Sequence, residues 1–299
     1  MSKKEKQIVM HEKDMQRVSE AQAAVRILVK FFTYLFLIFM AVIVLFPFYW
    51  MIISSLKTLD EYRLAVPTFW PQKIMFSNYA QAFTEGNLGR LFLNTLYVGG
   101  VSTILSLIIT VLSAFAFARL EFKGKNLMFG ALLATMMIPG ELFTITNYIT
   151  VNNFGWLNTY TVLIVPFLVS VFYIYLLRQN FMQIPNELYL AAKVDGTSDL
   201  KYLWKVMVPL ATPTLISITI LKMMGAWNSY IWPRLVANDE AHRLITNGLR
   251  NLSFTDEEEV VNYPVQMAAV AIVSAPLFLL FLFCRKYIMS GVSRSGIKG

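Results

Sequence analysis

Residues 185–213 read PNELYLAAKVDGTSDLKYLWKVMVPLATP, a polar segment that lies between long apolar ones. Its first part, residues 187–194, predicts a short helix in which Leu188, Ala191 and Ala192 share one face at helical spacing. Two of these side chains are small, so another protein can approach the helix closely. The segment therefore predicts a docking surface on a membrane protein.

A second helix is predicted after a turn in the same segment. Asp195 and Gly196 supply the turn, and Ser198 and Asp199 suit the start of the next helix. We expect Pro209 to end that helix, because proline lacks a backbone N–H donor. The apolar stripe of this helix has the spacing i, i+3, i+4, i+7 and consists of Leu200, Leu203, Trp204 and Met207.

The composition indicates a membrane protein. Of the 299 residues, 57% are hydrophobic and only 15% are charged, which excludes an ordinary soluble domain. The single cysteine, Cys284, excludes an internal disulfide and a cysteine-rich metal site, so we expect it to pack in the last membrane helix.

Six segments are long and apolar enough to cross a bilayer, whose core of about 30 Å requires about 20 residues per helix. The first is longer than the roughly 7–15-residue core of a signal peptide, so we expect it to be retained. The predicted spans are residues 30–53, 93–118, 127–149, 160–180, 214–235 and 264–287.

The Lys and Arg residues predict the orientation of these spans. Eighteen of the 26 lie in or near the N-terminal arm, the second loop, residues 185–213 and the C-terminal tail, whereas seven lie in the opposite loops. Both termini and residues 185–213 are therefore predicted to be cytoplasmic. The net charge of +8 reflects this topology and contact with anionic lipid, and we expect no nucleic-acid binding.

Several catalytic constellations are missing from the sequence. No Gly-rich loop ends in Gly-Lys-Ser or Gly-Lys-Thr, so any nucleotide chemistry must belong to a partner. His11 and His242 are expected to be surface residues that form neither a metal-binding pair nor a proton relay. We predict no catalytic residue, no metal site and no cofactor in this chain.

Lys222 is the charged residue that most needs explanation, because it is predicted roughly 12 Å inside its helix. It can attract an acidic or hydroxyl-rich substrate in a pathway, form an ion pair with Glu141, or extend toward the inner surface. Trp227 and Asn228 follow one turn later and suit stacking on a sugar ring and hydrogen bonds to its hydroxyl groups. Alternatively, Trp227 belongs to an interfacial aromatic belt and Asn228 bridges helices.

Three motifs, in the expected order along the chain, resemble those of ABC importer permeases of the carbohydrate-uptake, MalG-like branch. Ala191, Ala192, Gly196 and Pro209 have the spacing of the family's EAA loop, its socket for the ATPase. Residues 227–233, WNSYIWP, resemble a carbohydrate-permease signature, and residues 295–299, SGIKG, the tail of that branch. One departure is that the motif's opening glutamate falls on Leu190, whereas Glu187 lies three residues earlier.

The resemblance implies an all-α, MetI-like permease of six transmembrane helices in the cell membrane of a prokaryote. It implies a second homologous permease subunit, two ATPase subunits that hold ATP and Mg, and an extracytoplasmic binding protein that delivers a carbohydrate. Residues 185–213 are hereafter called the coupling segment. The residues implied to contact the ATPase are Glu187, Leu190, Ala191, Ala192, Asp195, Gly196 and Pro209 in this segment, and Gly296 and Lys298 in the tail.

The predicted organisation is a cytoplasmic arm at 1–29, a transmembrane domain at 30–290 and a cytoplasmic tail at 291–299. The substrate is expected to be a carbohydrate, most simply an oligosaccharide. Another polar solute, such as glycerol phosphate, a polyamine or a peptide, is the alternative within the same architecture. An ion-coupled secondary transporter is disfavoured, because Glu141 is the only candidate carboxylate in the predicted spans.

Overall fold

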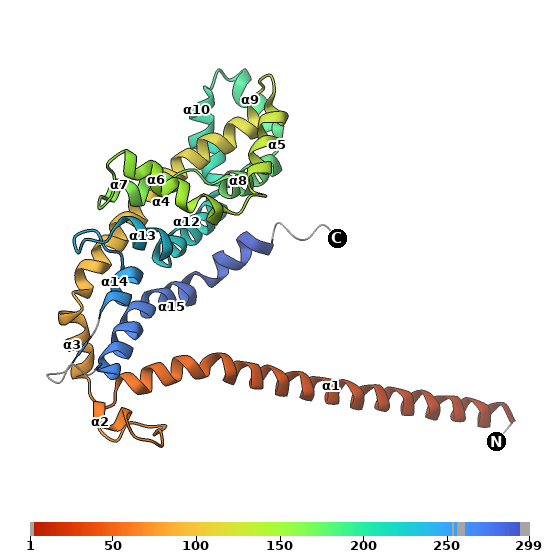
Figure 1. Ribbon diagram of the computed structural model, residues 1–299. Helices are drawn as coiled ribbons and strands as arrows, with labels where there is room; N and C mark the ends of the chain where they lie inside the picture. The colour runs from red at the N-terminus through yellow and green to blue at the C-terminus, as the bar shows by residue number, and fades with distance from the viewer. Residues whose placement is uncertain (1–2, 253, 256–260, 294–299) are drawn as a thin grey trace.

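The computed structural model describes residues 3–252, 254–255 and 261–293, and the side chains of all of these except 3–24, 251 and 287–293. Helices form nearly all of the regular structure in these ranges, and the only β-pairing there is an isolated bridge between Thr255 and Val261. Figure 1 shows an elongated helical body from which one long helix, α1, projects alone.

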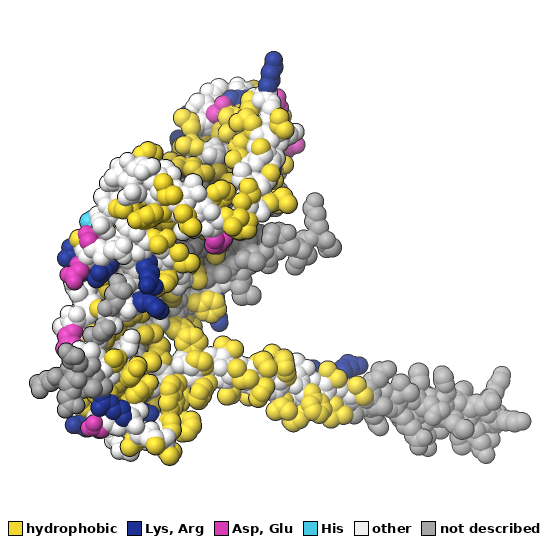
Figure 2. Space-filling model, in the orientation of Figure 1, with side chains coloured by type: hydrophobic (Ala, Val, Ile, Leu, Met, Phe, Trp, Pro, Cys, Tyr) yellow, Lys and Arg dark blue, Asp and Glu magenta, His cyan; other side chains and the backbone are white. Residues whose placement is uncertain are grey.

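The first helix, α1 (Lys3–Ser55), begins in the predicted arm and runs without a break through the first predicted span. Its C-terminal part packs on α15, where the Phe48 and Phe278 rings meet edge to face with centroids 4.9 Å apart. Its apolar side chains between residues 25 and 46 remain exposed, and Figure 2 shows hydrophobic surface along this projecting part of the helix. This part of α1 has no packing partner among the residues that the structure describes.

Two short helices, α2 (Leu59–Tyr62) and α3 (Ser77–Glu85), follow α1 and lead into α4 (Leu88–Arg119). The α4 helix is the longest element at the centre of the body, and it contacts α3, α7, α8, α12 and α14. The face that it buries contains small polar residues, which permit close helix approach in a membrane. Buried members of this face include Ser102, Thr103, Ser106 and Thr110.

The third and fourth predicted spans are bent. Residues 127–149 were expected as one helix, but α5 (Lys125–Thr135) is separated by Pro139 from η1 (Gly140–Phe143) and α6 (Thr144–Asn153), with a bend of 83°. Residues 160–180 divide into α7 (Tyr160–Ile164) with η2 (Val165–Phe167), and α8 (Val171–Gln183), with a bend of 46°. Proline at 139 and 166 and the N-capping Ser170 explain these breaks.

The coupling segment forms α9 (Asn186–Val194), α10 (Asp199–Tyr202), the π-helical turn η3 (Leu203–Met207) and α11 (Val208–Leu210), which lead into α12 (Thr212–Trp227). The chain then forms α13 (Ile231–Val236), α14 (Ile245–Asn251) and α15 (Tyr263–Ser293). The prediction of one helix over 214–235 is therefore wrong. The helix ends at Trp227, and the Asn228 amide turns back to donate to the Met224 carbonyl at 3.0 Å.

Three helical segments within the described residues, Val25–Ser55, Leu88–Arg119 and Tyr263–Lys286, are long and apolar enough to cross a membrane. Three bent pairs also pass this test, which gives up to six spans. The all-α membrane fold is confirmed, although half of its predicted spans are bent or broken.

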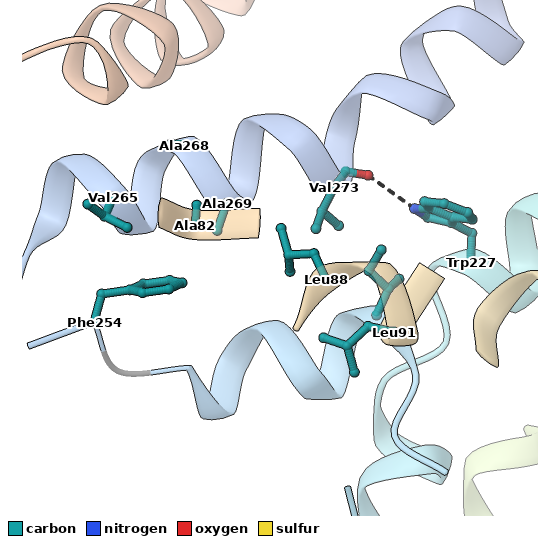
Figure 3. Close-up of a cluster of buried hydrophobic side chains, with 10 residues drawn as sticks. Ala82, Leu88, Leu91, Trp227, Phe254, Val265, Ala268, Ala269 and Val273 are labelled. Carbon is teal, nitrogen blue, oxygen red and sulfur yellow. Dashed lines mark hydrogen bonds between the residues drawn. The ribbon is translucent and has the colours of Figure 1, made fainter. Parts of the chain in front are cut away.

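Three large buried clusters, with a small fourth one at Phe117, Phe129 and Ile174, hold the body together. Of the large ones, one lies between α4 and α8 and includes residues of the coupling segment, another lies around α7 and α13, and the third joins α3, α4, α12 and α15. Figure 3 shows the third cluster, in which Ala268 and Ala269 of α15 lie beside Ala82 of α3. Small residues at this crossing permit close contact between the helix backbones.

Candidate functional site

The first helix of the coupling segment, α9, ends in a Schellman motif. The Thr197 N–H donates to the Ala192 carbonyl at 2.8 Å, and the Gly196 N–H donates to the Lys193 carbonyl at 3.0 Å. Gly196 has a φ of +71°, a conformation that costs other residues about 1–2 kcal/mol. A Cβ at this position would meet no atom within 4 Å, so the backbone conformation, and not lack of space, requires glycine.

One face of α9 is exposed along its whole length. Glu187, Leu190, Ala191 and Val194 have the spacing i, i+3, i+4, i+7, and all four are exposed. The exposed fraction reaches 56% at Leu190 and 89% at Val194. We call these four residues the α9 stripe. Leu190, where the family glutamate was expected, thus adds an apolar side chain to an outward-facing surface.

The opposite face of α9 packs on the body. Tyr189 and Ala192 are partly buried against the cluster between α4 and α8. The expectation that Leu188, Ala191 and Ala192 share one contact face is therefore wrong, because Ala192 points inward whereas Leu188 and Ala191 are exposed.

The second helix of the segment is anchored by a buried face. Tyr202, Leu203 and Met207 are at most 1% exposed and pack with Leu177 and Phe181 of α8. Leu200 and Trp204 remain 59% and 49% exposed, so the predicted apolar stripe is divided between the core and the surface.

Pro209 does not end this helix as expected. It lies inside α11, after the π-helical turn η3, and the bend of 80° into α12 comes at Ala211. A wider turn ahead of the proline accommodates the missing N–H donor and the bulk of the ring.

The two helices of the coupling segment are joined through one carboxylate oxygen. The Lys193 ammonium and the Tyr189 hydroxyl both donate to Asp199 Oδ1 at 2.7 Å. The hydrogen bond from Lys193 is the main reason that the pKa of Asp199 is lowered, and the bond from Tyr189 adds to it. The same bond to Asp199 raises the pKa of Lys193. These three residues link α9 to α10 by side-chain contacts.

The base of the coupling segment is tied by two arginines. Arg119, at the end of α4, donates to the Phe181 carbonyl at 2.8 Å and also to the Ile184 carbonyl. Arg178 of α8 donates through Nε to the Phe117 carbonyl of α4 at 3.0 Å, and its guanidinium lies 4.1 Å from the centre of the Phe129 ring. These bonds hold the C-terminal ends of α4 and α8 together just before α9 begins.

A second candidate site is a cavity of about 400 Å³ that contains Lys222. The cavity lies between α4, the break between α7 and α8, α12 and α13. Lys222 Nζ donates to the Phe167 carbonyl at 2.6 Å, and no ion pair with Glu141 is formed. The polar residues that line the cavity are Ser102, Ser170, Tyr173, Lys222 and Ser229.

Trp227 and Asn228 lie outside the lining of this cavity. Trp227 is 6% exposed, and its indole N–H donates to the Val273 carbonyl at 3.3 Å, as Figure 3 shows. Its ring also meets Phe92 edge to face at 5.4 Å. These contacts give Trp227 a packing role between α4, α12 and α15, and they leave no face open for a sugar ring. Asn228 is exposed and bonds back to α12.

Sequence reasoning missed a polar network beside the N-terminal part of α4, away from the coupling segment. His242 was expected at the surface, but it is half-buried, its Nδ1 lies 2.6 Å from Asp239 Oδ2 and its ring is 4.6 Å from that of Tyr160. The Tyr160 hydroxyl donates to Asn94 Oδ1 at 2.8 Å, and the Asn94 amide donates to backbone carbonyls of the 241–243 segment. The network joins α4 and α7 to this segment. The predicted tail contacts, Gly296 and Lys298, lie outside the described residues.

A helical membrane fold with an exposed two-helix segment at one end and a polar cavity in its body is typical of a membrane transport protein. Residues 106–294 match the family described as the binding-protein-dependent transport system inner membrane component. The chain belongs to this family.

Its relatives cover almost the whole chain. A diacetylchitobiose uptake system permease protein from Streptomyces coelicolor is 30% identical over 86% of this chain and 85% of its own length. An arabinooligosaccharides transport system permease protein from Bacillus subtilis is 28% identical over 89% of this chain and 94% of its own length. An sn-glycerol-3-phosphate transport system permease protein from Rhizobium meliloti is 30% identical over 85% of this chain and 93% of its own length.

A solved structure has the same fold. It belongs to a bacterial ABC transporter involved in the import of the acidic polysaccharide alginate, and it matches with a TM-score of 0.78 at 24% sequence identity. The match covers 85% of this chain and 94% of that one.

Proposed function

We propose that this chain is the membrane subunit through which an ATP-driven importer moves a carbohydrate, most simply an oligosaccharide, into the cytoplasm. Relatives named for diacetylchitobiose and arabinooligosaccharides support this substrate class. A cavity that combines hydroxyl groups with the aromatic rings of Phe167 and Trp232 also suits sugars, which have polar edges and apolar faces. A relative named for glycerol 3-phosphate makes a non-sugar solute the second candidate.

The coupling segment is proposed to dock one of two partner ATPase subunits, which bind ATP and Mg. The α9 stripe carries this proposal, because an exposed helix face that is apolar at Leu190, Ala191 and Val194 is suited to a hydrophobic groove in a partner. Closure of the ATPase pair would push α9, and the Asp199 contacts and arginine ties would pass that movement to α4, α8 and α12. This chain would thus supply movement and a pathway, while its partners hydrolyse ATP.

The remaining surfaces are assigned to the other components. The exposed apolar part of α1 is proposed to contact lipid and a second, homologous permease subunit, since no described residue of its own chain covers it. The segments between α1 and α4 and between α12 and α15 would face the extracytoplasmic binding protein. Both termini and the coupling segment would then be cytoplasmic, in agreement with the distribution of Lys and Arg.

The decisive experiment measures ATPase activity of the co-purified complex in lipid, with binding protein that is either empty or loaded from a panel of oligosaccharides. Stimulation by one loaded sugar, with accumulation of that sugar in vesicles, is the expected result. A folded membrane protein that recovers no ATPase subunit and imports the solute with an ion gradient would overturn the proposal.

A further inference from the structure

We propose that the cavity beside Lys222 binds the negatively charged group of an anionic saccharide: a carboxylate, sulfonate or phosphate. The inference rests on the proposed function, because it names the substrate class within carbohydrate import. The inference adds to the proposed function that this chain recognises the charge of the substrate.

Lys222 places a positive charge deep in the membrane body. It lies ten residues after the start of α12, which corresponds to about 15 Å along the helix axis. A charged side chain at such depth is costly unless it faces a partner or a water-filled cavity. Lys222 faces a cavity, and the side chain is only partly buried there.

The protein compensates this charge only in part. The Phe167 carbonyl accepts one hydrogen bond from Nζ, and it is available because η2 ends at Phe167 and α8 does not begin until Val171. A lysine ammonium has three donors, so two remain for a ligand. Because a carbonyl group carries no net charge, the positive charge of Lys222 remains in the cavity.

Within the described part of the chain, no carboxylate neutralises this charge. The lining of the cavity contains no Asp or Glu, and no described carboxylate forms an ion pair with Lys222. Glu141 is exposed at the start of η1, where it does not pair with Lys222. The missing counter-charge is therefore expected to come from a ligand.

The other polar groups of the cavity suit the rest of a sugar. The Ser170 oxygen accepts from the Tyr173 N–H at 3.4 Å, which leaves the Ser170 hydroxyl proton for a ligand. Tyr173 and Ser229 add hydroxyl groups, and the Phe167 and Trp232 rings, 5.5 Å apart, add apolar surface. The volume of about 400 Å³ lies within the roughly 300–1,000 Å³ of small-molecule pockets.

The test is a reactivity measurement that does not depend on transport. Cys284 is replaced by serine, and Ser229→Cys places one thiol in the cavity of the full complex in phosphatidylcholine nanodiscs, which contain no anionic lipid. The rates of modification by an anionic and a cationic methanethiosulfonate are compared. Lys222→Gln should lower the anionic-to-cationic rate ratio by at least about tenfold, because removal of a nearby charge acts in opposite directions on the two reagents.

Two matched variants separate charge from structure. Lys222→Arg should keep the ratio, and Lys73→Gln, which removes an exposed lysine outside the cavity, should leave it unchanged. A ratio that does not respond to Lys222→Gln would overturn the inference, since Lys222 would then only tie α12 to the Phe167 carbonyl.

Protection of the same thiol identifies the ligand. A uronate oligosaccharide, a sulfonated glycoside and inorganic phosphate are each compared with a neutral oligosaccharide of equal length, and protection should require an anionic group and Lys222. Equal protection by the neutral sugar, together with neutral-sugar transport, would refute the anionic class and leave the proposed function intact. If protection required an anionic group but no loaded sugar stimulated ATPase activity, the anion site would be supported and the proposed function would be refuted.

Discussion

Arg119 and Arg178 cap each other's helices. Arg119, the last residue of α4, donates to the carbonyls at the end of α8, while Arg178 of α8 donates to the Phe117 carbonyl near the end of α4. Positive groups at helix C-termini satisfy free carbonyls and interact favourably with the helix dipole. The reciprocal arrangement holds the two helices in a fixed relation where the coupling segment begins.

Arg119→Met should destabilise the protein by about 1.5–3 kcal/mol, the usual contribution of hydrogen bonds to charged groups. Thermal unfolding of the detergent-solubilised complex checks this expectation. Lys123→Met is the matched control, because Lys123 is exposed in the loop that follows α4. Equal losses in the two variants would mean that loop charge, and not the cap, is responsible.

Gly196→Ala should cost about 1–2 kcal/mol, because the Schellman turn requires a positive φ that alanine disfavours. Gly196→Asn should cost less, since asparagine adopts this conformation more readily. The measurement is hydrogen exchange at the amides of residues 194–199. Faster exchange in both variants to the same extent would contradict the backbone explanation.

Asp199→Asn should loosen the angle between α9 and α10, since the Lys193 ion pair is lost. The lowered pKa of Asp199 means that the carboxylate's stabilisation is present above its ordinary pKa of 3.8 and is lost as the pH falls through the lowered value. The raised pKa of Lys193 means that its contribution is present below 10.5 and is lost as the pH rises through the raised value.

The pair is therefore intact at neutral pH, and the variant's effect should be constant between about pH 5 and pH 9. Hydrogen exchange across residues 189–202, corrected for intrinsic rates, measures it. Asp195→Asn, on the exposed turn, is the matched control. An effect of Asp199→Asn that is no larger than that of Asp195→Asn would show that the ion pair does not hold the two helices together.

The sequence predicted the fold class because long apolar runs have few alternatives in a bilayer. It did not predict which of the six spans are broken. Pro139 and Pro166 lie at bends, whereas Pro47 and Pro276 lie inside the continuous helices α1 and α15. A proline removes one backbone donor in every case, but whether the helix bends depends on the neighbouring packing, which is not local in sequence.

The candidate site was predictable where its signal was local. The turn at Gly196 follows from a residue type that favours a positive φ. The division of the second helix into buried Leu203 and exposed Trp204 was not predictable, because a π-helical turn changes the side-chain spacing. The partner of Lys222 is a backbone carbonyl at a helix break, and any residue type can supply a carbonyl.

Trp227→Ala should destabilise the protein by about 3–5 kcal/mol, the usual cost of truncating a buried aromatic residue. Trp227→Phe should cost less, and neither variant should change which sugar stimulates the complex, because Trp227 packs against Phe92 and Val273 away from the cavity. Thermal unfolding and sugar-stimulated ATPase activity are measured together. A change in sugar preference without loss of stability would return Trp227 to the substrate pathway.

Val194→Asp should weaken recovery of the ATPase subunits, because it places a charge on the most exposed apolar position of the α9 stripe. The folded membrane protein should keep its stability, since Val194 is 89% exposed and contributes little to the core. Leu190→Glu restores the residue type of the family motif, and its effect on co-purification should be smaller than that of Val194→Asp.

Ala80→Asp is the matched control, because Ala80 is exposed on α3, a helix near the opposite end of the body. Co-purification of ATPase subunits, normalised to membrane protein of equal thermal stability, is the measurement. Undiminished recovery with Val194→Asp would contradict docking on the α9 stripe. Contact would then have to be sought at Leu200 and Trp204, the exposed apolar residues of the second helix, where the same substitution and the same measurement apply.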